Sequence, residues 1–320
     1  MGIEIKEKTF FVTGGAGFIG SNMVRTLLER GANVIVYDNL SMGKIEFIKQ
    51  FENTQKFEFI KADLLDTNSL SEAVRGKSID AVIHLAANSD IRKGTADTSI
   101  DLKQGIIATY NVLEECRKNN IKNILFSSSS AVHGIAEIKP TTESAPHKPI
   151  SMYGASKSAS ESLITAFSNL FGINYYIYRF ANVVGKNQTH GIIFDLLAKL
   201  QHHKDSVEVL GDGKQKKSYI NVQDCVNAML FVLQSSNEKR NLYNISSDDQ
   251  ISVQEIAELV VSKAAPEATI NYTGTKEGWP GDVPDAFLSP IKLKSLGFSV
   301  TMNSRQAVEN AVELALTSYY

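Results

Sequence analysis

Short apolar runs alternate with longer amphipathic stretches through the first 180 residues of the chain. The amphipathic stretches have helical periodicity, at residues 21–30, around 109–116 and in the stretch that contains Tyr153. The apolar runs are rich in β-branched and aromatic residues, as buried strands are, and comprise Thr9–Thr13, Asn33–Tyr37, Phe57–Ile60, Ala81–Ala87, Asn123–Phe126 and Tyr175–Phe180. Strands separated by helices predict an α/β protein with a doubly wound parallel sheet.

The pattern becomes less regular after residue 182 and predicts a smaller α/β lobe. Its expected elements are helices at about 192–202, 222–234, 252–263 and 304–317, with strands at 207–210 and 241–245. We expect residues 219–247 to return to the sheet. The larger lobe is then formed by residues 1–182 and 219–247, and the smaller, substrate-binding lobe by residues 183–218 and 248–320.

A glycine-rich turn joins the first predicted strand to the first helix. Gly14, Gly17 and Gly20 allow a tight turn, close approach of a pyrophosphate, and packing of the helix on the sheet. Asp38 ends the next strand, where a carboxylate accepts a hydrogen bond from a ribose 2′-hydroxyl and repels a 2′-phosphate. The turn therefore predicts a Rossmann-type site for NAD rather than NADP.

The other candidate residues also follow predicted strands. Ligands of doubly wound sheets bind at the carboxyl ends of the strands. The residues expected there are Gly14–Gly20, Asp38, Asp63, Ala86–Ala87, Ser127–Ser129 and Asn182. We therefore expect one site along one edge of the sheet.

Tyr153 and Lys157 are four residues apart and lie on one face of the predicted helix. A phenol ionises near pH ~10, and a neighbouring ammonium group lowers that pKa by favouring the phenolate. The pair is thus a candidate for proton transfer. The same spacing is common on ordinary helices, so the interpretation depends on the rest of the chain.

Composition excludes several classes of function. The net charge is −2, without a basic block, which argues against nucleic-acid and acidic-membrane partners. Cys116 and Cys225 are far apart and His190, His202 and His203 lack ligand spacing, so we expect a reducing compartment and no metal. No apolar run reaches about 18 residues, and no apolar leader precedes the first strand. We expect a cytoplasmic protein.

Seven ordered motifs across nearly the whole chain resemble the extended short-chain dehydrogenase/reductases. They are Gly14-x-x-Gly17-x-x-Gly20, Asp38–Asn39, Asp63–Leu64, His84–Ala87, Ser127–Ser129, Tyr153-x-x-x-Lys157 and Arg179-x-x-Asn182. Within that family the sequence is most similar to the UDP-glucose 4-epimerases and related nucleotide-sugar epimerases.

The resemblance implies a chemistry for three residues. Tyr153, as phenolate, takes the proton of the sugar 4-hydroxyl while C4 gives a hydride to NAD+. Lys157 binds the nicotinamide ribose and lowers the pKa of the phenol, and Ser129 hydrogen-bonds the reacting oxygen. The 4-keto sugar then turns and takes the hydride back on its other face.

The resemblance implies further contacts at the positions of this sequence that match those of the family. The cofactor contacts are Gly14, Gly17, Phe18, Ile19, Gly20, Asp38, Asn39, Ser41, Gly43, Asp63, Leu64, Leu85, Ala86, Ala87, Ser127, Tyr153, Lys157 and Ala181. The UDP-sugar contacts are Ser128, Ser129, Asn182, Ile192, Val209, Leu210, Lys217, Tyr219 and Asp282. The resemblance also implies a homodimer through the helix that contains Tyr153 and the one before it.

Several positions depart from the relatives. Ser130 and Ala131 stand where 4,6-dehydratases have two acidic residues, which favours epimerisation. Lys217 and Trp279 replace phosphate-clamping arginines, and Lys276 is a candidate for the second charge.

Two further departures involve small residues, and three positions have simpler structural interpretations. Gly105 replaces an asparagine near the cofactor and is expected to weaken the predicted helix locally. Ala286 leaves room for an N-acetyl group at C2 of the sugar. We interpret His84 as a hydrogen-bonded core residue, His133 as structural, and Asp224 as a helix cap.

Two alternatives to the epimerase remain. One is another nucleotide-sugar oxidoreductase, such as a 4-ketosugar reductase or a UDP-uronate epimerase. The other is a non-catalytic NAD-sensing protein on the same fold, which the presence of Ser129, Tyr153 and Lys157 disfavours.

Overall fold

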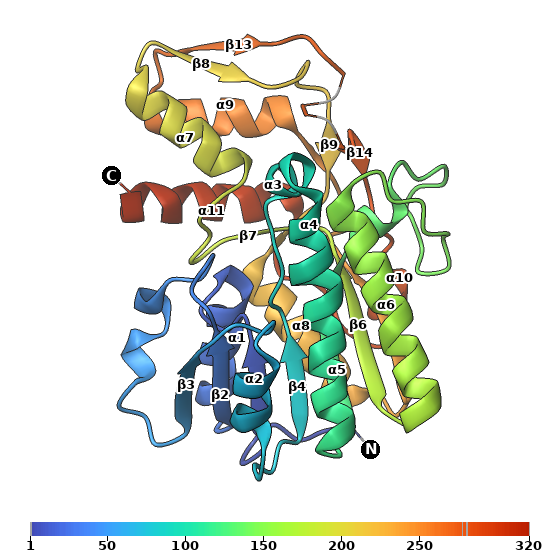
Figure 1. Cartoon of the computed structure of the whole chain (residues 1–320). Coiled ribbons are helices and arrows are strands. Elements are labelled where there is room, and N and C mark those ends of the chain that lie inside the picture. The colour runs from blue at the N-terminus through green and yellow to red at the C-terminus, as the bar shows by residue number, and fades with distance from the viewer. Residues whose placement is uncertain (1, 277, 280, 320) are drawn as a thin grey trace.

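A seven-stranded parallel sheet forms the larger lobe of the computed structural model, which describes residues 2–276, 278–279 and 281–319 (Figure 1). The strand order is β11-β6-β5-β4-β1-β2-β3, so the chain reverses direction across the sheet between β1 and β4. The strands are β1 (Thr9–Thr13), β2 (Asn33–Asp38), β3 (Phe57–Lys61), β4 (Ala81–His84), β5 (Asn123–Ser129), β6 (Asn174–Phe180) and β11 (Arg240–Ile245). The predicted doubly wound parallel sheet is confirmed.

Helices cover both faces of the sheet because its strands are apolar on both sides. Phe10 and Val12 of β1 point into a core with α1 (Phe18–Glu29) and α8 (Val222–Ser235). Phe11 points into the opposite core, which is completed by α2 (Thr67–Val74), α5 (Ala108–Lys118) and α6 (Met152–Phe171). The alternation of neighbouring side chains between two cores is the period-two pattern of a strand.

The smaller lobe lies above the carboxyl ends of these strands in Figure 1. Its core is built from α7 (Ile192–His202), α9 (Val253–Ala264) and α11 (Ser304–Tyr319). Short strands complete it: β7 (Asn182–Val184), β8 (Ser206–Val209), β9 (Lys216–Lys217), β10 (Tyr219–Asn221), β12 (Ile251–Ser252), β13 (Thr269–Tyr272) and β14 (Asp285–Ala286). A further helix, α10 (Ile291–Ser295), packs its Leu293 into the core of the larger lobe.

The segment before α5 differs from the simple helix that the sequence predicts. It consists of α3 (Ile91–Ala96), α4 (Thr98–Asp101) and a π-helix, η3 (Leu102–Ile107). A Cβ atom on Gly105 would lie 2.7 Å from both the Cβ and the Oγ of Ser156, so only glycine lets α6 approach η3 this closely.

Two local predictions are wrong. The strand predicted over 81–87 ends at His84, because Leu85–Ala87 leave the ladder and border a cavity. Asp224 does not cap α8, since Asn221 does, and its carboxylate instead accepts hydrogen bonds from the backbone of Thr301 and Met302. No helix in the described part of the chain is long and apolar enough to cross a bilayer.

Candidate active site

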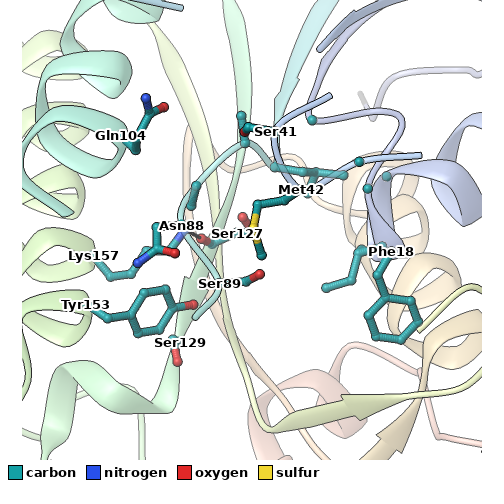
Figure 2. Close-up of a pocket in the computed structure, with 18 of the residues that line it drawn as sticks. Phe18, Ser41, Met42, Asn88, Ser89, Gln104, Ser127, Ser129, Tyr153 and Lys157 are labelled. Carbon is teal, nitrogen blue, oxygen red and sulfur yellow. Dashed lines mark hydrogen bonds between the residues drawn. The ribbon is translucent and has the colours of Figure 1, made fainter. Parts of the chain in front are cut away.

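A cavity of about 620 Å³ opens along the carboxyl ends of the parallel strands. Figure 2 shows Tyr153 and Ser129 on one side of it and Phe18 on the other. Apart from Asp63, every residue that we predicted to contact the cofactor lines this cavity. The structure thus brings together residues of β2, β5, β6 and α6 with the segments that directly follow β1 and β4.

The glycine turn has the geometry that its sequence requires. Gly14 has a φ of +70°, and a Cβ there would lie 2.7 Å from the backbone nitrogen of Ala86. A Cβ on Gly20 would lie 2.0 Å from the carbonyl oxygen of Gly14. Gly17 precedes α1 without a side-chain cap, so the N–H groups of the first helical turn remain available to an anion.

Asp38 and Asp63 have different places at this edge. The carboxylate of Asp38 lines the cavity and accepts from the backbone nitrogens of Ala16 at 2.9 Å and Leu40 at 2.8 Å. Burial raises the pKa of Asp38, and these two hydrogen bonds oppose that rise. The Asp63 carboxylate instead accepts from the side chain of Asn39 and the backbone of Leu65, so it supports the cavity wall from behind.

Tyr153 lies in the first turn of α6, with its hydroxyl beside Ser129 at the end of β5 (Figure 2). Ser151 caps this helix by accepting from the backbone nitrogen of Gly154, which fixes where the helix begins. Burial raises the pKa of Tyr153 to about 12, a hydrogen bond with Ser129 opposes this rise, and the charge of Asp101 adds to it.

The position of Lys157 corrects our expectation for the phenol. Its ammonium group donates to the carbonyl oxygen of Ser127 at 2.6 Å and lies 5.8 Å from the centroid of the Tyr153 ring. The pKa of Tyr153 is therefore raised rather than lowered in this structure, because desolvation of the phenolate outweighs its favourable contacts. Burial also lowers the pKa of Lys157 to about 8, against the charges of Asp101 and Glu161.

Sequence reasoning missed Asp101 and Asn88 beside this pair. Asp101 is 1% exposed, and its Oδ1 accepts from Asn88 Nδ2 at 3.1 Å, whereas its Oδ2 has no hydrogen-bond partner in the described part of the chain. Burial raises the pKa of Asp101, and the charge of Lys157 opposes this rise. The only sequence signal was a carboxylate four residues before Gly105, which does not reveal its burial.

A second cavity, of about 580 Å³, extends from the first toward the smaller lobe. Ser129 and Asn182 line both cavities, so they stand where the two meet. The other predicted substrate residues line the second cavity, namely Ile192, Val209, Leu210, Lys217, Tyr219 and Asp282, whereas Ser128 lines only the first. The sequence thus identified residues that the fold brings together from several loops and strands.

Lys217 has a partner inside the second cavity that the sequence did not reveal. Its ammonium group lies 2.5 Å from Asp282 Oδ1 and 5.1 Å from the centroid of the Trp279 ring. The buried Nε1 of Trp279 forms no hydrogen bond with any of the described residues. Lys276 is exposed and is absent from the described lining of both cavities, whereas Ala286 is part of the second lining.

His84 is a hydrogen-bonded core residue, as predicted. Its Nδ1 is 2.7 Å from Thr13 Oγ1, and its Nε2 is 3.0 Å from Thr109 Oγ1. Burial lowers the pKa of His84 to about 3, so the imidazole is neutral throughout the physiological range.

The fold and the two joined cavities define a dinucleotide-dependent enzyme with a tyrosine as its candidate acid–base group. The sequence model of the NAD dependent epimerase/dehydratase family matches residues 10–246. The chain belongs to this family, is an enzyme of the nucleotide-sugar epimerase type, and uses NAD.

Individual epimerases are similar to this chain in sequence and in structure. A putative UDP-glucose 4-epimerase of Methanocaldococcus jannaschii is 33% identical over 306 residues, which cover 94% of this chain and 96% of that protein. A crystal structure of a UDP-galactose 4-epimerase is 35% identical, with a TM-score of 0.87 over 98% of this chain and 100% of the other. A UDP-N-acetylglucosamine 4-epimerase of Methanobrevibacter ruminantium, in complex with UDP-N-acetylmuramic acid, is 27% identical, with a TM-score of 0.87 over 98% and 99%.

Proposed function

We propose that the protein interconverts the two C4 epimers of a UDP-sugar by way of a transient 4-keto sugar. The observation that carries this proposal is the position of Ser129, which lies beside the Tyr153 hydroxyl and lines both cavities. A sugar hydroxyl bound where the two cavities meet would lie next to Tyr153, the proposed proton acceptor. Positions 130 and 131 are serine and alanine and line the second cavity, so they offer no carboxylate for eliminating water.

The residues around the first cavity fit NAD. The glycine turn and the open start of α1 suit a pyrophosphate, and the Asp38 carboxylate suits a ribose hydroxyl. NAD held by these residues would supply a hydride acceptor for C4 of the sugar and a hydride donor for the resulting 4-keto sugar.

Tyr153 then receives the proton of the sugar 4-hydroxyl and later gives it back, while Ser129 holds the reacting oxygen. The pKa of about 12 that burial gives Tyr153 must fall for this step, and positive charge brought next to the phenol lowers it. Lys157 has a lowered pKa of about 8 and is largely protonated at pH 7, but its ammonium group is already present beside the phenol, so the added charge would come from the oxidised nicotinamide of bound NAD. The oxidation and reduction cancel, so net turnover consumes no cofactor.

The proposed substrate carries its nucleotide in the second cavity. The relatives described above are named for UDP-glucose, UDP-galactose and UDP-N-acetylglucosamine, which share the UDP group. We infer that Lys217, which lines this cavity together with Arg92 and Lys199, faces the diphosphate. The N–H of Trp279, which has no hydrogen-bond partner among the described residues, is a neutral donor beside it. Asp282 offsets part of the Lys217 charge, which predicts weaker diphosphate binding than two arginines would give.

We also propose a homodimer through η3, α5 and α6, which pack against one another, with α5 and α6 side by side in Figure 1. Leu102, Ile107 and Tyr110 are exposed by 46%, 40% and 47% on η3 and α5, and Phe171 is exposed at the end of α6. Light scattering after size-exclusion chromatography should give twice the chain mass. Tyr110→Asp should shift this mass toward the monomer, and an unchanged mass would count against the proposed surface.

The direct test is to incubate the purified protein with UDP-galactose, without added nicotinamide cofactor, and to follow UDP-glucose by NMR. Conversion is expected because a retained cofactor is regenerated in each turnover. Turnover only with NADH and a 4-keto sugar would instead identify a reductase. Epimerisation only of UDP-glucuronic acid would identify a uronate epimerase, and failure with all of these substrates would reject the proposal.

The small side chain of Ala286 predicts that the second cavity tolerates a substituent at C2 of the sugar. This residue lines the second cavity on β14, with Lys217 as its register partner on β9. We expect the wild-type protein to epimerise UDP-N-acetylglucosamine as well as UDP-glucose. Ala286→Tyr should lower kcat/KM for the N-acetyl sugar by about tenfold or more relative to UDP-glucose, since a steric clash affects only the larger substrate. Equal losses for both sugars would contradict this role.

A further inference from the structure

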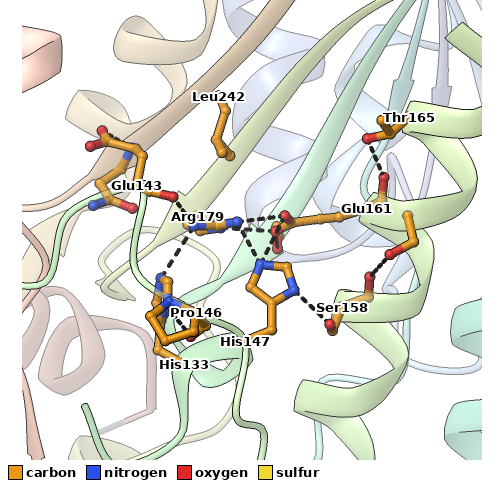
Figure 3. A network of polar contacts seen from close by, with 12 residues as sticks. His133, Glu143, Pro146, His147, Ser158, Glu161, Thr165, Arg179 and Leu242 are labelled. Atoms are coloured by element: carbon orange, nitrogen blue, oxygen red, sulfur yellow. Dashed lines mark hydrogen bonds and ion pairs between the residues drawn. The ribbon is translucent and has the colours of Figure 1, made fainter. Parts of the chain in front are cut away.

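The buried guanidinium group of Arg179 on β6 is at the centre of a polar cluster outside both cavities (Figure 3). It donates to the two Glu161 oxygens, from Nε to Oε1 at 3.0 Å and from Nη2 to Oε2 at 2.8 Å. It also donates from Nη2 to His147 Nε2 at 2.6 Å, and from Nη1 to the Glu143 carbonyl at 2.9 Å and to His133 Nε2 at 3.3 Å. Five N–H groups therefore meet five acceptors.

The partner atoms determine the protonation of both histidines. A guanidinium group can only donate, so His133 and His147 must each accept at an unprotonated Nε2 and carry their proton on Nδ1. The His133 Nδ1 then donates to the carbonyl oxygen of Pro146 at 3.2 Å. The His147 Nδ1 donates to Ser158 Oγ at 2.6 Å. Both imidazoles are thus neutral, and all four ring nitrogens have partners.

The cluster connects the helix that carries Tyr153 to a wall of the second cavity. Glu161 lies one turn beyond Lys157 on α6, and its Oε1 also accepts from Ser128 Oγ at 2.5 Å. His133 and His147 belong to residues 130–151, the segment that joins β5 to α6. Four residues of that segment line the second cavity: Ser130, Ala131, Ile150 and Ser151. We call Arg179, Glu161, His133 and His147 the arginine clamp.

We propose that neutral His133 and His147 are positioning residues that hold the cavity wall formed by residues 130–151 against the catalytic helix, and that acid releases this wall. Protonation of either Nε2 removes an acceptor from Arg179 and places a second cation against its guanidinium group. The wall then loses its histidine contacts with Arg179 on β6. Ser129, the residue before the wall, stays paired with Phe180 of β6, so the released segment begins at Ser130.

The charged groups around the histidines determine the direction of the effect. Burial and the charge of Arg179 lower the pKa of His133, to about 4, and also lower that of His147. Glu161 opposes both shifts, and its Oε2 lies 3.5 Å from His147 Nε2. The Glu143 carboxylate is engaged by the backbone nitrogen of Asn244. His147 is more exposed than His133, so we expect it to take up the first proton.

The first test needs no substrate and is therefore independent of the proposed function. Nitrogen-15 NMR of the imidazoles in the full chain should show both as Nδ1–H tautomers at pH 7.5. An Nε2–H tautomer at either residue would overturn the proposal. On titration from pH 7.5 to 5, amide exchange of residues 130–151, corrected for its intrinsic pH dependence, should rise by about tenfold.

The variants separate the positioning role from a merely structural one. His147→Gln keeps an acceptor near the Nε2 position and cannot be protonated, whereas His147→Leu removes the acceptor. The exposed His203, at the end of α7, provides a matched control as His203→Gln. His147→Leu should increase amide exchange of residues 130–151 at pH 7.5 by about tenfold. His147→Gln should restore slow amide exchange at pH 7.5 and weaken its increase in acid. His203→Gln should keep the wild-type increase in acid.

The kinetic measurement rests on the proposed epimerase activity. KM for UDP-galactose should rise about tenfold in His147→Leu at pH 7.5, and in the wild-type protein between pH 7.5 and 5. His147→Gln should reduce both increases. If the Gln variant keeps the full wild-type acid transition in exchange, or if the Leu variant exchanges like wild type, the proposal is wrong. A protein without epimerase activity would still be judged by the exchange and tautomer results.

Discussion

At the scale of single residues, the acid–base role that we propose for Tyr153 depends on the environment of its phenol. Burial holds the pKa of Tyr153 at about 12, so the group is protonated at neutral pH until positive charge reaches it. Lys157 directs its ammonium group to the Ser127 carbonyl, which joins α6 to β5. Lys157 therefore holds α6 against the end of β5, and its charge alone does not bring the pKa of the phenol below its usual value.

Tyr153→Phe should remove epimerisation almost completely while leaving the fold intact. The ring is retained, but the proton acceptor is lost, and general acid–base groups contribute about 10²–10⁴-fold to rate. We expect kcat for UDP-galactose to fall by at least about 10³-fold, with an unchanged melting temperature. A second variant, Ser129→Ala, keeps the phenol and should cause a smaller loss. Undiminished turnover by Tyr153→Phe would exclude the mechanism.

At the scale of elements, the contact between η3 and α6 positions the helix that carries Tyr153. Gly105 is the point of closest approach, and its carbonyl oxygen accepts from Thr109 Oγ1 at 2.6 Å and from Ser160 Oγ at 3.4 Å. The sequence suggested that this glycine weakens the helix. The structure shows instead that its missing side chain is a requirement of packing.

Gly105→Ala should lower the free energy of unfolding by about 1–3 kcal/mol, although alanine is the better helix former. The new Cβ would meet the Cβ and Oγ of Ser156 at 2.7 Å. Ser156→Gly removes both atoms, so the double variant should lose at least about 1 kcal/mol less than the sum of the single losses. Urea unfolding of all four proteins measures this coupling, and additive losses would argue against the clash.

At the scale of the whole molecule, buried neutral histidines make stability depend on pH. The pKa of His84 is lowered to about 3 and that of His133 to about 4, whereas an unfolded histidine titrates near pH ~6.5. The unfolded chain therefore binds more protons in this range. Their contribution is fully present above pH ~6.5 and is lost as the pH falls toward 4 for His133 and 3 for His84.

Between pH 7.5 and 5, we expect the free energy of unfolding to fall by about 2 kcal/mol for each of these two histidines. Urea unfolding at the two pH values measures the change. His133→Gln should remove roughly half of it, whereas His203→Gln should leave it unaltered because that residue is exposed. A stability that is constant across this range would show that the two imidazoles are not held neutral by the fold.

The sequence by itself determined the features that local patterns encode. Apolar runs predicted the strands of the sheet, the glycine spacing predicted the turn before α1, and Asp38 was placed correctly at the end of β2. Of the residues predicted to contact the cofactor or the substrate, all except Asp63 line the two cavities, although Ser128 lines the first cavity rather than the second. Those at strand ends meet because the carboxyl ends of parallel strands lie at one edge of the sheet.

Only the tertiary structure decided which distant groups meet and which of them lose water. The pairing of Lys217 with Asp282, the burial of Asp101 and the acceptors around Arg179 join residues that no periodicity relates. The direction of the Tyr153 pKa shift also depends on burial, which helix spacing does not specify. Spacing fixes which side chains share a face, whereas desolvation and long-range contacts arise only when the faces pack.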